Sequence, residues 1–380
     1  KSLYGLVQAP MLYYNHLKAG LKACGLEPSE QDPCMIIGRG MVALSYVDDV
    51  LWLGPDLEEI DKVIQELQNA GMPLTVEDDD AYAFLGVDIV PMAKISFEPS
   101  NEGFYMSQTG LIDKVLKTVG MTDSKQKRTP ASSTPLGTDA KGHSFQGEWD
   151  YARVVGMLLY LSSNSRPDIQ FAVHQCARFT HNPKQSHGDA VKRICRYLQG
   201  TRNRGLIFTP TKEMTLDCYS DADFAGLWSY EEDQDPVCVK SRTGYVLTLA
   251  GCPLIWASKL QTEIALSTLE SEYIALSTAI RELIPLRRVL QEVGRALDLE
   301  FSKPSIIQST CFEDNNGALG LALTPRLTPR TKHIGVKYHF FKSMIGEDKG
   351  IIIRRVDSAL QKADIFTKGL SQETFESIRK

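Results

Sequence analysis

Four carboxylates in the C-terminal half of the sequence stand where predicted strands and helices meet. Asp221 lies in the predicted strand LDCYSDAD, and Glu272 lies on a long predicted helix beside an apolar stripe. Asp314 ends another predicted strand, and Asp364 lies in the last predicted helix. Carboxylates beside apolar faces are costly unless their charge is compensated. If they converged, the four could hold two Mg²⁺ ions, which activate a water and stabilise the leaving oxygen in phosphodiester cleavage.

Spacing alone leaves other roles open for these acids. An Asp that ends a strand is often the N-cap of the next helix, which is the alternative role for Asp314. Glu272 could border the apolar stripe and keep its carboxylate in solvent. Asp223 and Glu270 lie close enough in the sequence to be the acids of the site instead.

A second pair of acids, Asp48 and Asp49, lies in the stretch SYVDDVLWLG. The flanking segments MVALSYV and VLWLGP predict two strands joined by a tight turn at this pair. A turn that needs only polar residues would suit Asp-Gly better. Two neighbouring carboxylates at a hairpin tip therefore indicate a site for divalent cations.

The predicted elements that position these acids form an α+β arrangement. In the first third, helices are predicted at 12–24, 56–71 and 107–121, and strands at 41–47, 50–55, 81–90 and 94–99. A segment rich in Pro, Ser and Thr predicts a linker at 122–149, and helices follow near 150–163 and 187–199. From residue 205 the sequence predicts strands at 205–210, 214–226, 242–251 and 252–259, and the long helix at 267–294. Alternating strands and helices after it complete a mixed sheet with helices on its faces.

Composition places the chain among ordinary globular proteins but hides two basic patches. The 380 residues are 43% hydrophobic and carry a net charge of −5, yet residues 151–215 hold ten Lys or Arg against three acids, and residues 326–343 hold five against none. Such patches are typical of contacts with a phosphate backbone, although a solvated basic face is the alternative. The eight Cys contain no Cys-x-x-Cys pair, which argues against a zinc site and predicts reduced thiols. The sequence contains no run of 18 apolar residues, so it predicts no membrane span.

Several collinear motifs resemble the Pol polyprotein of copia-type LTR retrotransposons. KSLYGLVQAP, SYVDDVLWLG and FLGVDI resemble the second half of the reverse transcriptase, and GMLLYLSSNSRPDIQFAV with VKRICRYLQGTRNRGL resembles its thumb and connection helices. SDADFAG, SRTGYVLTLAGCPLIWASK, STLESEYIALS, EDNNGALGLA, RTKHIGVKYHFF and KADIFTKGL resemble the ribonuclease H domain. The resemblance runs in order over essentially the whole chain.

This resemblance implies a partial palm and start of the thumb at 1–121, a linker at 122–149, a helical thumb or connection at 150–204, and a ribonuclease H-like α/β domain with a mixed sheet at 205–380. The motifs assign the catalytic, metal-binding acids of the ribonuclease H domain to Asp221, Glu272, Asp314 and Asp364. Asp48 is implied as a metal ligand of the polymerase site, assisted by Asp49. The implied cofactor is Mg²⁺, two ions per active site, with Mn²⁺ as an alternative.

The resemblance also implies partners. An RNA–DNA hybrid and a template-primer duplex are the expected nucleic acids, and other segments of a parent polyprotein are expected around this chain. Contacts with the nucleic acid are predicted at Arg178, Lys184, Lys192, Arg193, Arg196, Arg330, Lys332, His333 and Lys337. No membrane partner is expected, and the location is expected to be cytoplasmic, in a virus-like particle for the intact element, or nuclear.

Two features bear on which activity the chain keeps. In the family the first catalytic Asp of the polymerase lies upstream of KSLYGL, where this sequence begins, so we expect ribonuclease H activity and an incomplete polymerase. The family pattern has basic residues where this chain has Val7 and Met11. The alternative is an inactive element remnant that at most binds nucleic acid.

Overall fold

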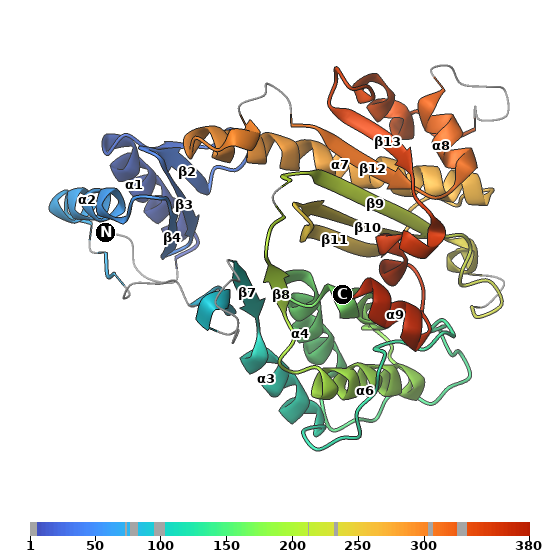
Figure 1. The fold of residues 1–380 in the computed structure, drawn as a ribbon. Coiled ribbons are helices and arrows are strands. Elements are labelled where there is room, and N and C mark those ends of the chain that lie inside the picture. Colours follow the sequence, from blue (N-terminus) through green and yellow to red (C-terminus); the bar gives the residue numbers. More distant parts are fainter. Residues whose placement is uncertain are drawn as a thin grey trace. The chain divides into compact units, whose positions relative to one another are not determined.

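The computed structural model describes residues 6–72, 74–76, 83–94, 103–211, 213–231, 235–302, 307–324 and 333–380 (Figure 1). The chain divides into two compact units, one of residues 1–84 and 282–307 and the other of residues 85–281 and 308–380. Helix α7 (Thr268–Ala296) contributes its first part to the second unit and its last part to the first unit. The predicted strand at 94–99 lies almost wholly outside the described residues.

The first unit is a small antiparallel sheet with helices. Its elements are α1 (Ala9–Ala23), β1 (Glu27–Pro28), β2 (Met35–Gly38), β3 (Met41–Tyr46), β4 (Asp49–Leu53), α2 (Leu57–Asn69), β5 (Ala83–Phe84) and the short helix η4 (Glu300–Ser302). The strands pair in the order β1-β2-β3-β4. Asp56 caps α2 by accepting a hydrogen bond from the Glu59 backbone N–H. Leu17 and Leu21 of α1 and Val63 and Leu67 of α2 share one core with the strands.

The second unit begins with the antiparallel strands β6, β7 and β8 and a helical layer. The elements here are β6 (Val87–Pro91), η1 (Met92–Lys94), β7 (Phe104–Ser107), α3 (Thr109–Val119), α4 (Tyr151–Asn164), η2 (Pro167–Ile169), α5 (Gln170–Ala177), α6 (Gln185–Gly200) and β8 (Leu206–Phe208). β8, which the sequence grouped with the strands after it, pairs instead with β7. Helix α5 was not predicted from the sequence.

A five-stranded mixed sheet completes the second unit and confirms the predicted fold class. Its order is β11-β10-β9-β12-β13, with β10 antiparallel to both neighbours and β12 parallel to β9 and to β13. The elements are β9 (Leu216–Asp223), η3 (Pro236–Val239), β10 (Arg242–Leu249), β11 (Cys252–Leu260), β12 (Ser309–Glu313), α8 (Asn316–Leu323), η6 (Val336–Met344), β13 (Ile351–Arg355), η7 (Ser358–Leu360), η8 (Lys362–Phe366) and α9 (Gln372–Ile378).

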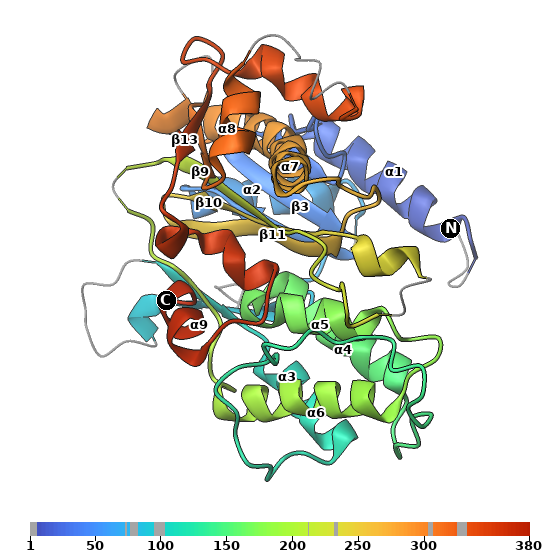
Figure 2. The same ribbon diagram turned by 90° about the vertical axis from the view of Figure 1, so that its right-hand side faces the viewer.

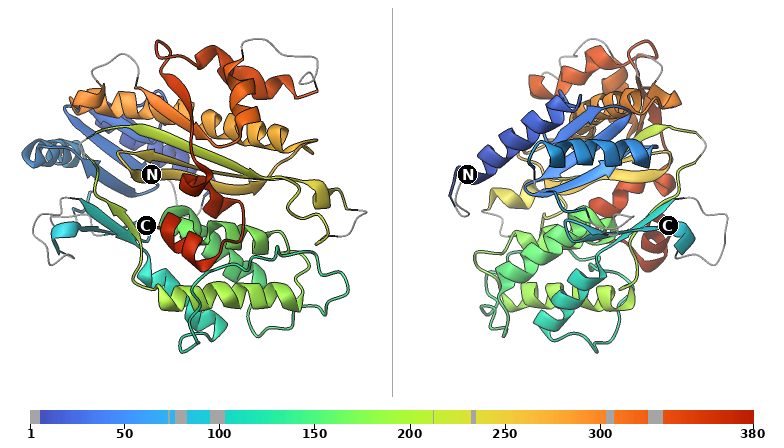
Figure 3. Two further views of the ribbon diagram at one scale, coloured as in Figure 1. Left: turned by 45° about the vertical axis from the view of Figure 1, so that its right-hand side comes forward. Right: turned by 90° about the vertical axis from the view of Figure 1, so that its left-hand side faces the viewer.

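The two faces of this sheet are covered by different helices. Figure 2 shows the first part of α7 on one face and α5 on the other. One hydrophobic core joins the helical layer to the sheet, because Val246 of β10 and Phe366 of η8 pack in the same cluster as Leu158 and Ile194. Helix α9 reaches this cluster through Phe375, and Figure 3 shows the C-terminus beside the green helices.

Candidate active site

Three of the predicted catalytic acids converge near the C-terminal ends of the neighbouring strands β9 and β12, in the interior of the mixed sheet. Asp221 comes from β9, Glu272 from the second turn of α7, and Asp314 directly follows β12. One carboxylate oxygen from each lies within 4.8 Å of the others. Asp221 and Glu272 are buried, and Asp314 is partly exposed. Asn315, rather than Asp314, caps α8 through the backbone N–H groups of Gly317 and Ala318, so the N-cap alternative for Asp314 is wrong.

The electrostatics of this cluster call for a cation. Burial raises the pKa of Glu272 to about 10, with further contributions from the negative charges of Asp221, Glu313 and Asp314. One oxygen of Glu272 and one of Asp314 are buried without a hydrogen-bond partner. Buried acceptors that lack donors are rare in folded proteins and mark an absent ion or water. The donors are all hard carboxylate oxygens, the ligand type that Mg²⁺ and Mn²⁺ take in proteins.

Asp364 completes the quartet beside Asp221. Burial raises the pKa of the Asp364 carboxyl to about 7, and the charge of Asp221 adds to this effect. The ammonium of Lys368 lies 2.9 Å from Asp364 and 3.8 Å from Asp221. The hydroxyl of Thr367 donates a hydrogen bond to Asp221. Lys368 therefore partly neutralises this carboxylate pair, and Thr367 fixes the orientation of Asp221.

A glycine allows this close approach. Gly244 of β10 pairs with Asp221 in the antiparallel register, and a Cβ at this position would lie 2.6 Å from the Thr367 side chain and 2.8 Å from that of Phe366. Contacts this short do not occur for real Cβ atoms, so any side chain here would push η8 away. The glycine thus lets η8 bring Asp364 to the strand that carries Asp221.

The sequence reasoning missed a fifth acid, Glu313. It is fully buried at the end of β12, and burial together with the charges of Asp314 and Asp221 raises its pKa well above the ordinary value. The strand alternation was a usable signal, because Ser309, Cys311 and Glu313 form the buried set of this strand. One Glu313 oxygen accepts from the Asn315 backbone N–H at 3.0 Å, while the other has no partner.

The raised pKa values predict that metal binding stabilises the folded chain, and more strongly at higher pH. Between the ordinary carboxyl pKa and the raised values of Asp364 and Glu272, the folded state holds protons that the unfolded chain releases. These groups therefore destabilise the metal-free protein progressively as pH rises above about 4. We expect Mg²⁺ to raise the melting temperature relative to EDTA, and more at pH 8 than at pH 5.5. A free Mg²⁺ concentration a hundred times the Kd would add about 2.7 kcal/mol to the free energy of unfolding.

Scanning calorimetry at the two pH values, with and without Mg²⁺, checks this expectation. The matched control is Asp221→Asn, which removes a shared ligand and should lose most of the Mg²⁺ effect. An equal Mg²⁺ effect in the wild type and in this variant would contradict a metal site at the cluster.

The second pair of acids is placed at a hairpin tip, one residue away from the predicted turn. Tyr46 pairs with Asp49, so the turn residues are Val47 and Asp48, and Asp49 begins β4. Val47 has a φ of 54°, a conformation that is strained for a β-branched residue. Both acids are exposed. Burial together with their negative charges raises the pKa of Tyr13 in α1. Among the described residues, no third metal-ligating side chain joins them.

The predicted nucleic-acid contacts fall into three groups. Arg178 is mostly buried and pairs with the buried Glu231. Lys184 precedes α6, and Lys192, Arg193 and Arg196 lie on α6 with half-buried side chains. Lys337 pairs with Glu263, and His333 Nε2 lies 3.3 Å from a Glu270 oxygen. Arg330 and Lys332 lie outside the described residues.

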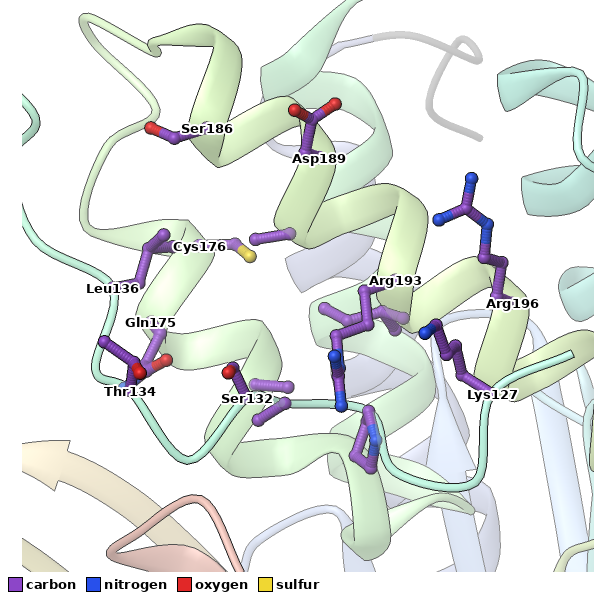
Figure 4. A pocket seen from close by; sticks show the side chains of 15 residues that line it. Lys127, Ser132, Thr134, Leu136, Gln175, Cys176, Ser186, Asp189, Arg193 and Arg196 are labelled. Carbon is purple, nitrogen blue, oxygen red and sulfur yellow. The ribbon is translucent and has the colours of Figure 1, made fainter. Parts of the chain in front are cut away.

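Arg193 and Arg196 line a cavity of about 350 Å³ between α5, α6 and residues 127–136 (Figure 4). Lys127 lies beside them at the same end of the cavity, and Arg193 donates to the Thr129 hydroxyl at 2.8 Å. Burial lowers the pKa of the Arg193 guanidinium. Among the predicted nucleic-acid contacts that the structure describes, Arg193 and Arg196 are the two that line the same cavity.

Comparison with known proteins agrees with both halves of this description. A family model described as reverse transcriptase (RNA-dependent DNA polymerase) matches residues 1–133. The chain is 33% identical to the retrovirus-related Pol polyprotein from transposon TNT 1-94 of Nicotiana tabacum and 31% identical to that from transposon RE1 of Arabidopsis thaliana, each over 99% of this chain. It is also 30% identical to the putative transposon Ty5-1 protein YCL074W of Saccharomyces cerevisiae, over 74% of this chain and 87% of that protein.

These matches define a chain of the reverse transcriptase class. The chain belongs to the copia-type family of retrotransposon Pol polyproteins, and the resemblance found in the sequence motifs is confirmed. It spans 27% of the tobacco polyprotein and 24% of the RE1 polyprotein.

The chain is also similar to solved structures. One of them is the N-terminal RNase H domain of rv2228c from Mycobacterium tuberculosis, as a fusion with maltose binding protein, at 10% identity, over 44% of this chain and 97% of that chain. Its TM-score of 0.25 is too low to carry an argument. In the described part of the chain, no helix has the length and apolar character needed to cross a membrane.

Proposed function

We propose that this chain hydrolyses the RNA strand of RNA–DNA hybrids with two divalent metal ions, as the ribonuclease H part of a copia-type Pol polyprotein. The observation that carries the proposal is the convergence of Asp221, Glu272 and Asp314 within 4.8 Å, with Asp364 tied to Asp221 through Lys368. Mg²⁺ is the proposed cofactor and Mn²⁺ its alternative.

The chain's own residues would hold and orient the reacting groups. Asp221, Glu272 and Asp314 would hold the metal, and Asp364 would complete the second site. When bound, a pair of such ions activates a water and stabilises the leaving oxygen of the phosphodiester. Ser358 donates a hydrogen bond of 2.8 Å to Asp314 and so fixes its carboxylate. These supports hold the ligands before the substrate arrives, which is what metal sites need from their surroundings.

The polymerase half is proposed to be incomplete in this chain. Asp48 would be its metal ligand and Asp49 would assist, but the two exposed acids have no third ligand among the described residues. RNA-directed DNA polymerase activity is therefore assigned to the longer polyprotein. Val7 is 98% exposed and Met11 64% exposed, so neither apolar side chain is held by this chain's own core.

The proposed partners are an RNA–DNA hybrid and a template-primer duplex, held by basic side chains of the region 150–204 and of the segment around His333 and Lys337. Phosphate contacts of this kind position a duplex without reading its sequence. Other segments of the polyprotein are proposed as further partners, and the domain boundaries at residues 121, 149 and 204 remain predictions. An intracellular location, cytoplasmic or nuclear, is part of the same proposal.

One experiment tests both activities. The whole chain is incubated with a labelled RNA–DNA hybrid that has a recessed DNA 3′ end, with deoxynucleotides and either Mg²⁺ or EDTA. We use the whole chain because residues on both sides of position 205 share one core. The expected result is Mg²⁺-dependent cutting of the RNA and no extension of the DNA. A folded chain that binds the hybrid but never cuts it would instead be an inactive remnant.

A further inference from the structure

A buried arginine outside the carboxylate cluster has no charge partner. Arg242, the first residue of β10, is only 4% exposed. Its Nη1 donates to the Ser258 hydroxyl at 3.2 Å, and its guanidinium carbon lies 5.3 Å from the centre of the Phe171 ring. Its Nη2 is buried without any hydrogen-bond partner. Among the described residues, no carboxylate lies within ion-pair distance of this guanidinium.

The charges around Arg242 compensate it only in part. Its partner in the antiparallel register is Asp223 of β9. Burial lowers the pKa of Arg242 to about 10, the positive charge of Arg178 adds to this effect, and the charge of Asp223 opposes it. A buried charge left without a partner is strongly unfavourable. The site is therefore suited to receive an anion.

A cavity of about 260 Å³ lies in front of this guanidinium. Besides Arg242, the residues that line it include the cations Lys240 and Lys368, the acid Asp223, and Ser133. The volume is below that of most pockets for drug-sized ligands and suits a single small anionic group. Lys368 also contacts the carboxylates of Asp221 and Asp364, so the cavity adjoins the proposed catalytic centre.

We propose that this cavity binds one backbone phosphate of the nucleic-acid substrate, adjacent to the scissile position, through the guanidinium of Arg242, which lines it. The planar guanidinium presents parallel N–H donors that match phosphate oxygens. Lys240 adds a second positive charge at the cavity wall. This inference rests on the proposed function, since it names a substrate-binding residue for the same site.

The test measures binding of a short RNA–DNA hybrid by fluorescence anisotropy, with Ca²⁺ in place of Mg²⁺ so that nothing is cut. Arg242→Gln should weaken binding about tenfold or more, as expected for the loss of a charged hydrogen bond. The slope of log affinity against log salt should fall by about one phosphate contact. Arg295→Gln, which removes an exposed arginine from the last turn of α7, outside the proposed contact regions, is the charge-matched control and should change neither quantity.

Combining the Arg242 variant with hybrids that carry one neutral linkage then identifies the backbone phosphate that Arg242 contacts. Hybrids carrying one methylphosphonate at successive linkages should show one position that weakens the wild type but not Arg242→Gln. If that variant fails to fold, Arg242→Lys, which keeps the charge but loses the fork, takes its place and should lose most of this sensitivity.

Two results would overturn the proposal: unchanged affinity and salt slope in a folded Arg242→Gln chain, or a methylphosphonate profile that the wild type and the Arg242 variants share at every linkage. Because binding is measured without cleavage, an Arg242-dependent phosphate contact in a chain that never cuts would refute the nuclease assignment and leave the phosphate site standing.

Discussion

Asp221→Asn and Glu272→Gln should each reduce hybrid cleavage by about a thousandfold or more. Both changes keep the shape of the side chain and remove a charged metal ligand. A catalytic metal contributes several kcal/mol of transition-state stabilisation, and each 1.36 kcal/mol corresponds to a factor of ten in rate. The measurement is the initial rate of RNA cutting by the whole chain at saturating Mg²⁺.

Stability separates this catalytic loss from misfolding. The carboxylates of the cluster repel one another, and burial already raises the pKa of Glu272 to about 10. Replacing one acid by its neutral amide relieves that repulsion. In EDTA, both variants should therefore melt at the temperature of the wild type or above it, while their cleavage is lost.

Asp217→Asn is the matched control for this experiment. Asp217 lies on the same strand as Asp221, four residues earlier and on the same face, and it is not part of the cluster. Its replacement should leave the cleavage rate within a few-fold of the wild type. If Asp217→Asn lost as much activity as Asp221→Asn, the site would extend along β9 and the metal assignment would be wrong.

The sequence predicted the main acids of the site, but not the charged residues that lie beside them. Asp221 on a strand, Glu272 on the long helix and Asp314 at a strand end all follow from local patterns, and the structure brings the three together. Glu313 was missed because a charged residue at a strand end is ordinarily exposed, whereas β12 lies inside the sheet between β9 and β13 and Glu313 is fully buried. Lys368 was missed because its contact with Asp221 depends on how η8 crosses the sheet.

Long-range pairing also limits what the sequence says about the basic residues. Arg178 was predicted to contact nucleic acid as part of a basic patch, but its guanidinium lies against Glu231, 53 residues later in the chain. A charge count cannot find that partner. Helix α5 was missed for a related reason: its buried set includes Gln170 and Gln175, so the apolar stripe that identifies a helix is incomplete.

Asp168→Ala should destabilise the chain by about 3–5 kcal/mol, the usual cost of leaving one partner of a buried ion pair alone. Arg166 and Asp168 are both buried and form a two-pronged pair, with Nε 2.9 Å from one Asp168 oxygen and Nη2 2.8 Å from the other. Burial acts to raise the pKa of Asp168, but the guanidinium of Arg166 holds it below the ordinary value. Tyr197 of α6 donates a further hydrogen bond of 2.5 Å to the same carboxylate.

This network joins three parts of the second unit, which is why its loss should affect the whole unit. Arg166 also donates to the backbone carbonyl and to the hydroxyl of Thr201 after α6, at 3.0 and 2.7 Å. Arg379, after α9, donates to the Tyr197 hydroxyl at 2.9 Å. The pair thus ties η2 to α6 and, through Tyr197, to the C-terminal helix.

Urea unfolding of the whole chain, followed by circular dichroism, measures the effect. The contrasting variant is Arg202→Met, which removes an exposed arginine paired with Asp113 and should cost no more than about 1 kcal/mol. Replacing Arg166 and Asp168 together by Met and Leu should recover most of the loss, since no charge is then left unpaired. If the double variant were as unstable as Asp168→Ala, the stabilisation would come from the shape of these side chains and their hydrogen bonds to α6, and not from the pairing of their charges.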